Sequence, residues 1–326
     1  MKQKVYVTRL LPKAAMDRIH SFCEAEVWDG ELSPPRDVLL KKVGDVEGLL
    51  SLLTEKVDGE LFSRAPKLKV VSNCAVGFDN IDIPEATKRG IIVGNTPGVL
   101  TETTADFAFA LLMAAARRVV EGDRIVRSGG WKTWGPMTLL GYDIYGSTLG
   151  IIGLGRIGVA MARRAKGFGM KLLYYDLVRR KDVESELGIK YVNLDTLLKE
   201  SDFVTIHTNL TPETRHLIGA KQFAMMKKTS ILVNDARGPI VDNDALYEAL
   251  RDGRIAFAGL DVTEPEPIPS NHPLLTLDNV IVTPHIASAS VETRTKMALM
   301  AAENLIAGLK GKMPPNAVNP EVLKEK

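Results

Sequence analysis

Short apolar runs alternate with longer helical stretches along almost the whole chain. Most of these runs are rich in β-branched residues and lack an alternation of polar and apolar positions, which is typical of strands covered on both faces. They span residues 5–11, 68–73, 91–96, 147–155, 171–176, 202–208, 230–236, 255–262 and 279–285. Because strands that alternate with helices form parallel sheets, the pattern predicts an α/β fold with doubly wound parallel sheets.

Two of the helical stretches are unusually apolar. Residues 104–126 are hydrophobic on nearly every side over their first two thirds, and residues 294–309 show a similar pattern. Such helices are buried between packed bodies, so we interpret both as connections between two domains. The first domain is expected to comprise residues 1–98 and 289–326, and the second residues 99–288. Residues 313–326 are rich in proline and charge, which predicts a loosely attached surface strip.

Composition narrows the class of protein. The 326 residues suit two domains, and 45% hydrophobic with 25% charged residues is typical of a soluble globular protein. A net charge of +2 gives no reason to expect nucleic acid or an anionic membrane as a partner. No apolar run of about eighteen residues and no secretory signal are visible. The two cysteines, Cys23 and Cys74, are too few for a disulfide framework, so we expect reduced thiols, a cytoplasmic location and no metal site.

A glycine pattern indicates a dinucleotide cofactor. Residues 153–158 read GLGRIG and match G-x-G-x-x-G between a predicted strand and a predicted helix. In that context Gly153 permits a tight turn, Gly155 lets a pyrophosphate approach the backbone, and Gly158 lets helix and strand pack closely. The alternative is a strand–helix turn that binds nothing, because glycine is common and the pattern alone is weak.

Asp176 at the end of the next strand bears on the choice of cofactor. Its carboxylate can accept hydrogen bonds from both ribose hydroxyl groups and would repel a 2′-phosphate, so NAD is favoured. Arg179 and Arg180 follow closely and could bind that phosphate, which leaves NADP open. The two arginines could also be a solvated surface pair.

Three later strand ends carry charged residues. SILVNDARG ends near Arg237, IAFAGLDVTEPEP leads to Glu266, and NVIVTPH ends in His285. Ligands of doubly wound sheets bind beyond the carboxyl ends of the strands, so these side chains are expected to face the dinucleotide. Together they suit hydride transfer to a 2-oxo acid: His285 would move the proton, Glu266 would orient the ring, and Arg237 would hold the substrate carboxylate. Each residue alone is more simply interpreted as a structural or solvent-exposed charge. Their joint placement at consecutive strand ends is what favours catalysis.

Several motifs resemble the D-isomer-specific 2-hydroxyacid dehydrogenases. They are GIIGLGRIG, NDARGPIVDNDAL, GLDVTEPEP and TPHIASAS, together with NCAVGFDNID and NTPGVLTETTADFA. The resemblance covers nearly the whole chain and implies a Rossmann nucleotide-binding domain and a flavodoxin-like substrate domain. Within the family, residues 129–158 and 259–288 look most like glyoxylate/hydroxypyruvate reductases, which use NAD(P)H.

The resemblance also implies site residues. Arg237, Glu266 and His285 match the family's catalytic trio. The implied substrate-binding residues are Leu53, Val76, Gly77, Trp134, Arg237, His285 and Ser288. The implied cofactor-binding residues, which include the glycine pattern, are Thr104, Gly153, Leu154, Gly155, Arg156, Ile157, Gly158, Asp176, Thr208, Asn209, Asp235, Ala236, Arg237, Asp261, His285 and Ala287. A homodimer paired through the nucleotide-binding domains is implied as well, in which Trp134 either reaches the neighbouring subunit's site or only packs at the dimer contact.

Two other functions remain as alternatives. A D-2-hydroxyacid dehydrogenase for lactate, 3-phosphoglycerate or a bulkier acid would carry the same motifs, because the shape of the pocket decides the substrate. Glu266 stands where the family's formate-oxidising members carry glutamine, which argues against formate. A dinucleotide-sensing binding protein, like the family's transcriptional corepressors, is disfavoured by the short termini.

Overall fold

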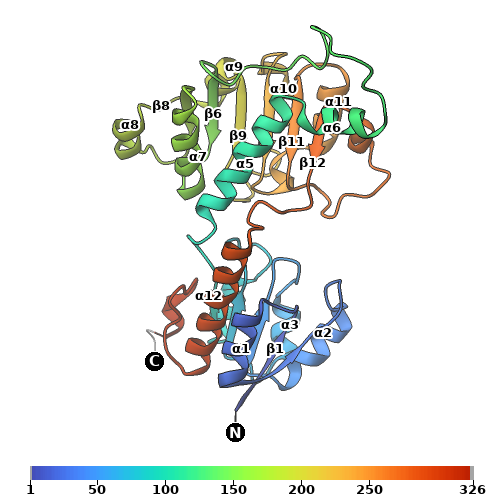
Figure 1. The fold of residues 1–326 in the computed structure, drawn as a ribbon. Coiled ribbons are helices and arrows are strands. Elements are labelled where there is room, and N and C mark those ends of the chain that lie inside the picture. Colours follow the sequence, from blue (N-terminus) through green and yellow to red (C-terminus); the bar gives the residue numbers. More distant parts are fainter. Residues whose placement is uncertain (1, 324–326) are drawn as a thin grey trace. The chain divides into compact units, whose positions relative to one another are not determined.

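The computed structural model describes residues 2–323 and divides into two compact units (Figure 1). Unit 1 comprises Met1–Leu100 and Ala289–Lys326, and unit 2 comprises Thr101–Ser288. The sequence placed the first division after residue 98, whereas the structure places it after Leu100. Both sheets are built entirely from parallel pairs, so the predicted α/β fold is confirmed.

Unit 1 contains a five-stranded sheet in the order β2-β1-β3-β4-β5. Its strands are β1 (Gln3–Val7), β2 (Cys23–Val27), β3 (Gly48–Ser51), β4 (Val70–Asn73) and β5 (Ile92–Gly94). Its helices are α1 (Lys13–Phe22), α2 (Arg36–Lys42), η1 (Val43–Asp45), α3 (Gly59–Arg64), α4 (Ile83–Lys88), α12 (Val291–Leu309) and η4 (Pro320–Leu323). Strands β3, β4 and β5 are buried along their whole length because helices cover both faces of the sheet.

Unit 2 contains a seven-stranded sheet in the order β12-β11-β10-β9-β6-β7-β8. Its strands are β6 (Thr148–Ile152), β7 (Lys171–Tyr175), β8 (Lys190–Tyr191), β9 (Phe203–Ile206), β10 (Ile231–Asn234), β11 (Phe257–Leu260) and β12 (Val280–Val282). Its helices are α5 (Thr101–Ala116), α6 (Val119–Arg127), α7 (Arg156–Gly167), α8 (Lys181–Leu187), α9 (Leu194–Glu200), α10 (Ala220–Met225), η2 (Gly238–Ile240), α11 (Asn243–Arg251) and η3 (Pro273–Thr276).

All nine predicted strands are confirmed, and three further strands within residues 2–323 were missed. Strand β2 has two charged positions, Glu24 and Glu26, at the edge of its sheet, and β8 has only two residues. Strand β3 overlaps the leucine-rich run LLSLL, and leucine is a strong helix former. These segments form strands because a neighbouring strand offers backbone partners, which local propensity does not reveal.

The prediction of a single helix over residues 104–126 is wrong. The structure has two helices, α5 and α6, separated at Arg118, whose φ of 53° is left-handed and cannot continue an α-helix. The carbonyl group of Ala116 instead accepts a hydrogen bond from the Tyr142 N–H at 2.9 Å. Within unit 2, α5 runs across the sheet and packs on α7, β10 and β11 (Figure 1). Gly259 makes this packing close, because a Cβ there would lie 2.7 Å from Leu111 Cγ.

The prediction that the C-terminal residues are loosely attached is also wrong for the part that the structure describes. Ala317 pairs with Gly94 of β5, and the Val318 N–H donates to the Val93 carbonyl at 2.7 Å. The fully buried Asn319 side chain accepts from the Val93 N–H at 2.7 Å and donates to the Ile91 carbonyl at 3.0 Å. Residues 317–319 therefore bond to the edge strand of the sheet, and residues 324–326 lie outside the described part. None of the helices in residues 2–323 is long and apolar enough to cross a membrane.

Candidate active site

The sheet of unit 2 reverses its strand order between β6 and β9. From β6 the chain proceeds outwards through β7 and β8, and it then returns to β9 and continues through β10 to β12 on the other side. In open α/β sheets, ligands bind at the carboxyl ends of the strands beside such a reversal. Gly153 follows β6, and Arg237, Glu266 and His285 follow β10, β11 and β12 in turn. The sheet therefore places all of these predicted site residues at the carboxyl ends of its strands.

The structure brings His285 and Glu266 into direct contact. Nδ1 of His285 and Oε1 of Glu266 are 2.5 Å apart, and the two side chains are 23% and 34% exposed. The contact fixes the orientation of the ring, because only one nitrogen can face the carboxylate. His285 itself has a left-handed backbone with φ 55°, which is uncommon for residues other than glycine. A strained backbone at such a residue is typical of functional sites.

Asp261 holds the backbone around His285 in this conformation. Its carboxylate accepts hydrogen bonds from the Ile286 N–H at 2.9 Å, from the Ala287 N–H at 2.7 Å and from the Thr283 hydroxyl at 2.7 Å. Its backbone carbonyl accepts from the His285 N–H at 2.9 Å. Burial raises the pKa of Asp261, and these hydrogen bonds oppose the rise. The predicted contact of Asp261 with the cofactor stays a prediction, whereas the structure shows that Asp261 organises the turn that carries His285.

Asn234 organises the loop that carries Arg237. Its buried amide donates to the Arg237 carbonyl at 2.9 Å and accepts from the Ala236 N–H at 3.1 Å, while Nη1 of Arg237 donates to the Ala236 carbonyl at 2.8 Å. The next residue, Gly238, lies so close to the loop after β11 that a Cβ would be 1.9 Å from the Thr263 carbonyl oxygen. The loops bearing Arg237 and Glu266 are therefore in backbone contact. Sequence reasoning missed Asn234, whose only signal is an amide at the end of a buried strand.

The glycine pattern forms the turn between β6 and α7. Gly153 has φ 91°, and a Cβ on Gly158 would lie 2.1 Å from the Gly153 carbonyl oxygen, so both positions require glycine. At Gly155 an added Cβ would meet nothing within 4 Å, which leaves open space beside the helix N-terminus. Helix α7 has no side-chain cap and no acidic residue in its first turn, which includes Arg156 and Ile157. Its N-terminal N–H groups thus suit an anion such as a pyrophosphate.

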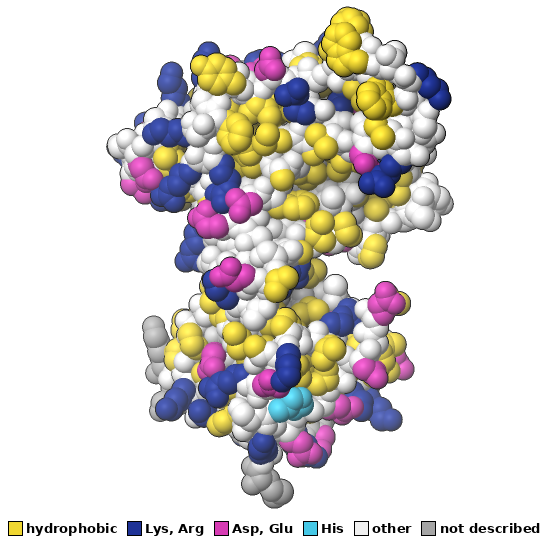
Figure 2. All heavy atoms as spheres, in the orientation of Figure 1, with side chains coloured by type: hydrophobic (Ala, Val, Ile, Leu, Met, Phe, Trp, Pro, Cys, Tyr) yellow, Lys and Arg dark blue, Asp and Glu magenta, His cyan; other side chains and the backbone are white. Residues whose placement is uncertain are grey.

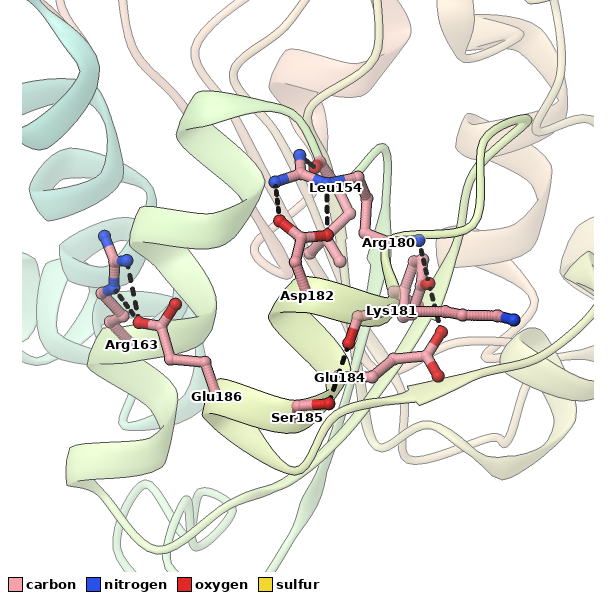
Figure 3. A network of polar contacts seen from close by, with 9 residues as sticks. Leu154, Arg163, Arg180, Lys181, Asp182, Glu184, Ser185 and Glu186 are labelled. Carbon is pink, nitrogen blue, oxygen red and sulfur yellow. Dashed lines mark hydrogen bonds and ion pairs between the residues drawn. The ribbon is translucent and has the colours of Figure 1, made fainter.

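Asp176 lies beside this turn at the end of β7. Its carboxylate accepts from the Leu154 N–H at 2.7 Å and from the Val178 N–H at 3.0 Å. Arg180 donates to Asp182 at 2.7 and 3.0 Å and reaches the Leu154 carbonyl at 3.3 Å (Figure 3). Arg179 donates twice to Glu184 at 2.9 Å. Each of the two arginines therefore has its own carboxylate partner.

The remaining predicted cofactor residues of unit 2 are spread over four elements. Thr208 and Asn209 follow β9, Ala236 follows β10, Ala287 follows β12, and Thr104 is a buried residue of α5. Asp235 has a fully buried side chain whose Oδ1 lies 3.2 Å from Nδ1 of His207. His207 bonds Thr205 Oγ1 at 2.9 Å through its other nitrogen and was not predicted.

The predicted substrate-binding residues are divided between the units. Leu53 follows β3 in unit 1 and Val76 and Gly77 follow β4, whereas Trp134 and Ser288 belong to unit 2. The Val76 carbonyl accepts from Asn95 at 2.7 Å and the Gly77 carbonyl from Asn73 at 3.0 Å, so two asparagine side chains hold this loop. The loop with Leu53 is held by buried Glu55, which accepts from the Leu52 N–H at 2.6 Å and from Thr8 at 2.7 Å. In residues 2–323 no group of three or more His, Cys, Asp or Glu side chains could hold a metal ion.

Several known proteins resemble this chain over almost its whole length. A family model described as D-isomer specific 2-hydroxyacid dehydrogenase, NAD binding domain, matches residues 109–287. A protein of Korarchaeum cryptofilum named glyoxylate reductase is 61% identical over 99% of this chain and 98% of its own length. A crystal structure from Thermus thermophilus is 49% identical over 97% of this chain and 99% of that one, with a TM-score of 0.92. An NADPH-dependent glyoxylate/hydroxypyruvate reductase from Sinorhizobium meliloti, solved with NADP and malonate, is 32% identical over 98% of both chains with a TM-score of 0.86.

Proposed function

Since the chain belongs to the D-isomer specific 2-hydroxyacid dehydrogenases, a family of oxidoreductases, we propose that it reduces glyoxylate and hydroxypyruvate to glycolate and D-glycerate. The observation that carries the proposal is the 2.5 Å contact between His285 and Glu266, at the sheet edge that also bears the glycine turn. The name of the relative from Korarchaeum cryptofilum supports glyoxylate as the substrate.

The proposed chemistry places a proton transfer at His285. When bound, the nicotinamide dinucleotide supplies the hydride that the carbonyl carbon of the acid accepts. Negative charge then develops on the carbonyl oxygen, and protonated His285 neutralises it by donating a proton from Nε2. Glu266, which contacts Nδ1, keeps the ring in the orientation that this donation requires. In the reverse direction the same nitrogen accepts the proton from the hydroxyl group.

Substrate binding is assigned to Arg237 and to the loop after β4. The Arg237 guanidinium can bind a carboxylate through two parallel hydrogen bonds, which fixes the direction of the acid. The backbone N–H groups of Val76 and Gly77 are proposed to bind a carboxylate of the acid, since asparagine side chains hold the carbonyl groups of this loop. Leu53 and Ser288 are each proposed to contact the acid and thereby to limit its size.

The residues around Asp176 favour NAD over NADP as the cofactor. The carboxylate lies beside the Leu154 N–H of the glycine turn, where the adenosine ribose of a dinucleotide is expected. A 2′-phosphate would be repelled by Asp176 and would have to compete with Glu184 and Asp182 for the two arginines. Because those ion pairs are partly exposed, a phosphate can displace them at small cost, so NADPH is expected to be used less well rather than rejected.

Initial rates test the substrate and the cofactor together. Glyoxylate, hydroxypyruvate, pyruvate and phosphohydroxypyruvate should each be offered with NADH and with NADPH. We expect the highest kcat/KM for glyoxylate or hydroxypyruvate, and a higher value with NADH than with NADPH. A preference for pyruvate or phosphohydroxypyruvate would instead assign the chain to another member of the family, and a preference for NADPH would show that Arg179 and Arg180 outweigh Asp176.

A homodimer is proposed from the exposed apolar segment, which we define as residues 119–145 of unit 2. Trp134, Met137 and Tyr145 are 78%, 76% and 84% exposed, and Val119, Val126, Trp131 and Leu140 are exposed as well. Figure 2 shows hydrophobic side chains over the face of unit 2 along which α5 runs. Aromatic residues and methionine are enriched at protein interfaces, so this segment suits contact with a second copy of the chain.

Sedimentation equilibrium tests the dimer. We expect a mass about twice that of the 35.7 kDa chain, and we expect the pair of substitutions Trp134→Glu and Met137→Glu to shift it towards the monomer, since both would place charge in an apolar contact. Leu32→Glu is the matched control, because Leu32 is 80% exposed but lies in unit 1. Trp134→Ala separates the two roles of this residue. If Trp134 only packs at the dimer contact, the substitution weakens the dimer. If Trp134 contacts the substrate, the substitution raises KM in protein that is still dimeric.

A cytoplasmic location is proposed from the cysteines. Cys23 and Cys74 are both free and buried, and burial raises the pKa of each thiol to about 11. Both thiols therefore stay protonated and unreactive at neutral pH. A protein without disulfides fits a reducing compartment.

A further inference from the structure

The connection between β9 and α10 contacts both loops that carry proposed catalytic residues. Within residues 211–219, the His216 N–H donates to the Pro239 carbonyl at 2.8 Å, two residues after Arg237. The Ile218 N–H donates to the Ile240 carbonyl at 3.1 Å, and Ile218 pairs with Val241 in a parallel bridge. Backbone hydrogen bonds therefore join this connection to the loop that follows Arg237.

Side chains of the same connection reach the loop that carries Glu266. Nε2 of His216 lies 2.9 Å from Oε2 of Glu264, and Arg215 donates to the other oxygen of that carboxylate. The Glu264 carbonyl accepts from the Asn243 amide at 2.6 Å. Burial would raise the pKa of Glu264, but the hydrogen bonds from His216 and Arg215 outweigh it and hold the pKa below its usual value. Glu264 is thus held by both its side chain and its backbone, two residues before Glu266.

His216 has a left-handed backbone with φ 51°, an uncommon conformation for a residue other than glycine. Such strain persists only where surrounding contacts impose it, and it is found chiefly at functional sites. Here the backbone bond to Pro239 and the side-chain bond to Glu264 impose it from two directions. The strained residue therefore links the loop after β10 to the loop after β11.

We propose that His216 and Glu264 are positioning residues, which hold the Glu266 loop against the Arg237 loop and so keep Glu266 at His285. The proposal rests on the proposed function, since it concerns the same proton transfer. Neither residue is expected to touch substrate or cofactor. The side chains of His216 and Glu264 are 44% and 28% exposed, so their contact contributes little to the free energy of unfolding. Its expected effect is on the position of Glu266 relative to His285.

The test uses the substitutions Glu264→Gln and His216→Asn, singly and together. Gln keeps the length of the side chain but loses its charge, and Asn tolerates a left-handed backbone but is too short to reach Glu264. Glu186→Gln is the matched control, because Glu186 forms an exposed ion pair with Arg163 that touches neither loop (Figure 3). Turnover is measured on the 2-oxo acid that the unaltered protein reduces best. The Nδ1 proton between His285 and Glu266 is followed by NMR in protein labelled with ¹⁵N-histidine, which needs no substrate.

We expect each single substitution to lower kcat about tenfold, because small displacements of catalytic groups are costly, while KM and the melting temperature stay close to those of the control. The double substitution should cost no more than the larger single one, since both break the same contact. The His285 Nδ1 proton signal should broaden or disappear, whereas that of buried His207 should stay. Unchanged kcat with an unchanged His285 signal would overturn the proposal, as would a general loss of stability with that signal intact. If no 2-oxo acid is reduced, the proposed function fails, and the NMR signal still decides this inference.

Discussion

Replacing His285 by asparagine is expected to lower kcat about 10³-fold, the range of general acid catalysis by a positioned imidazole. Asparagine is the appropriate replacement because the φ of 55° at this position is left-handed, and asparagine tolerates that region better than alanine does. Dinucleotide affinity should stay close to that of the unaltered protein, because the glycine turn and Asp176 are unchanged. Steady-state rates and a fluorescence titration with NADH measure the two quantities.

His20→Asn is the control for this substitution. His20 is an exposed residue in the last turn of α1 in unit 1, and its replacement should leave kcat unaltered. The acid–base role would be refuted by a His285→Asn protein that keeps most of its turnover. A simultaneous loss of dinucleotide binding would show instead that the turn at Asp261 has been disturbed, since Asp261 bonds the backbone at residues 286 and 287.

Replacing Arg237 by lysine is expected to lower kcat/KM about 100-fold, with most of the loss in KM. Lysine keeps the positive charge but cannot form two parallel hydrogen bonds to a carboxylate. Loss of one charged hydrogen bond corresponds to about 3 kcal/mol at most, which is roughly a factor of 100. Neutral methionine at the same position should cost more, because the attraction to the acid is then lost as well.

Arg251→Lys provides the matched comparison for Arg237→Lys. Arg251 pairs with Asp252 at the end of α11 and is half exposed, so its replacement should leave kcat/KM intact. Steady-state kinetics on glyoxylate and on hydroxypyruvate give the required values for the unaltered protein and for the three variants. If Arg237→Lys altered kcat alone while KM stayed constant, Arg237 would act on the transition state and the assignment to carboxylate binding would be wrong.

Much of the site could be predicted from residues that are close in sequence. The turn from Gly153 to Gly158 follows a buried strand and opens a helix, and both neighbours can be recognised from their own apolar periodicity. The family resemblance is confirmed by the comparisons, and the predicted parallel sheets are confirmed by the structure. The roles of Arg237, Glu266 and His285 stay predictions, although the contact between Glu266 and His285 has the geometry that they require.

Other features were hidden because they depend on contacts between distant residues. The break at Arg118 was missed because arginine is a good helix former, and its left-handed backbone follows from the fold around it. Asn319 reads as part of a loose tail, yet it bonds to β5 across more than two hundred residues of chain. Asn234 and His207 look like ordinary polar residues at strand ends until the neighbouring strands are in place.

By itself, the sequence determined the α/β class. It also predicted a division after residues 98 and 288, a dinucleotide turn and three charged residues at strand ends. These depend on local periodicity, on glycine where no side chain fits, and on motifs a few residues long. Only the tertiary structure decided that Glu266 meets Nδ1 of His285, and that His216 meets Glu264 across 48 residues of sequence. The physical reason is that the parallel pairing of β9 with β10, β10 with β11 and β11 with β12 sets which strand ends are neighbours. The loops that follow these strands come into contact only once that pairing has formed.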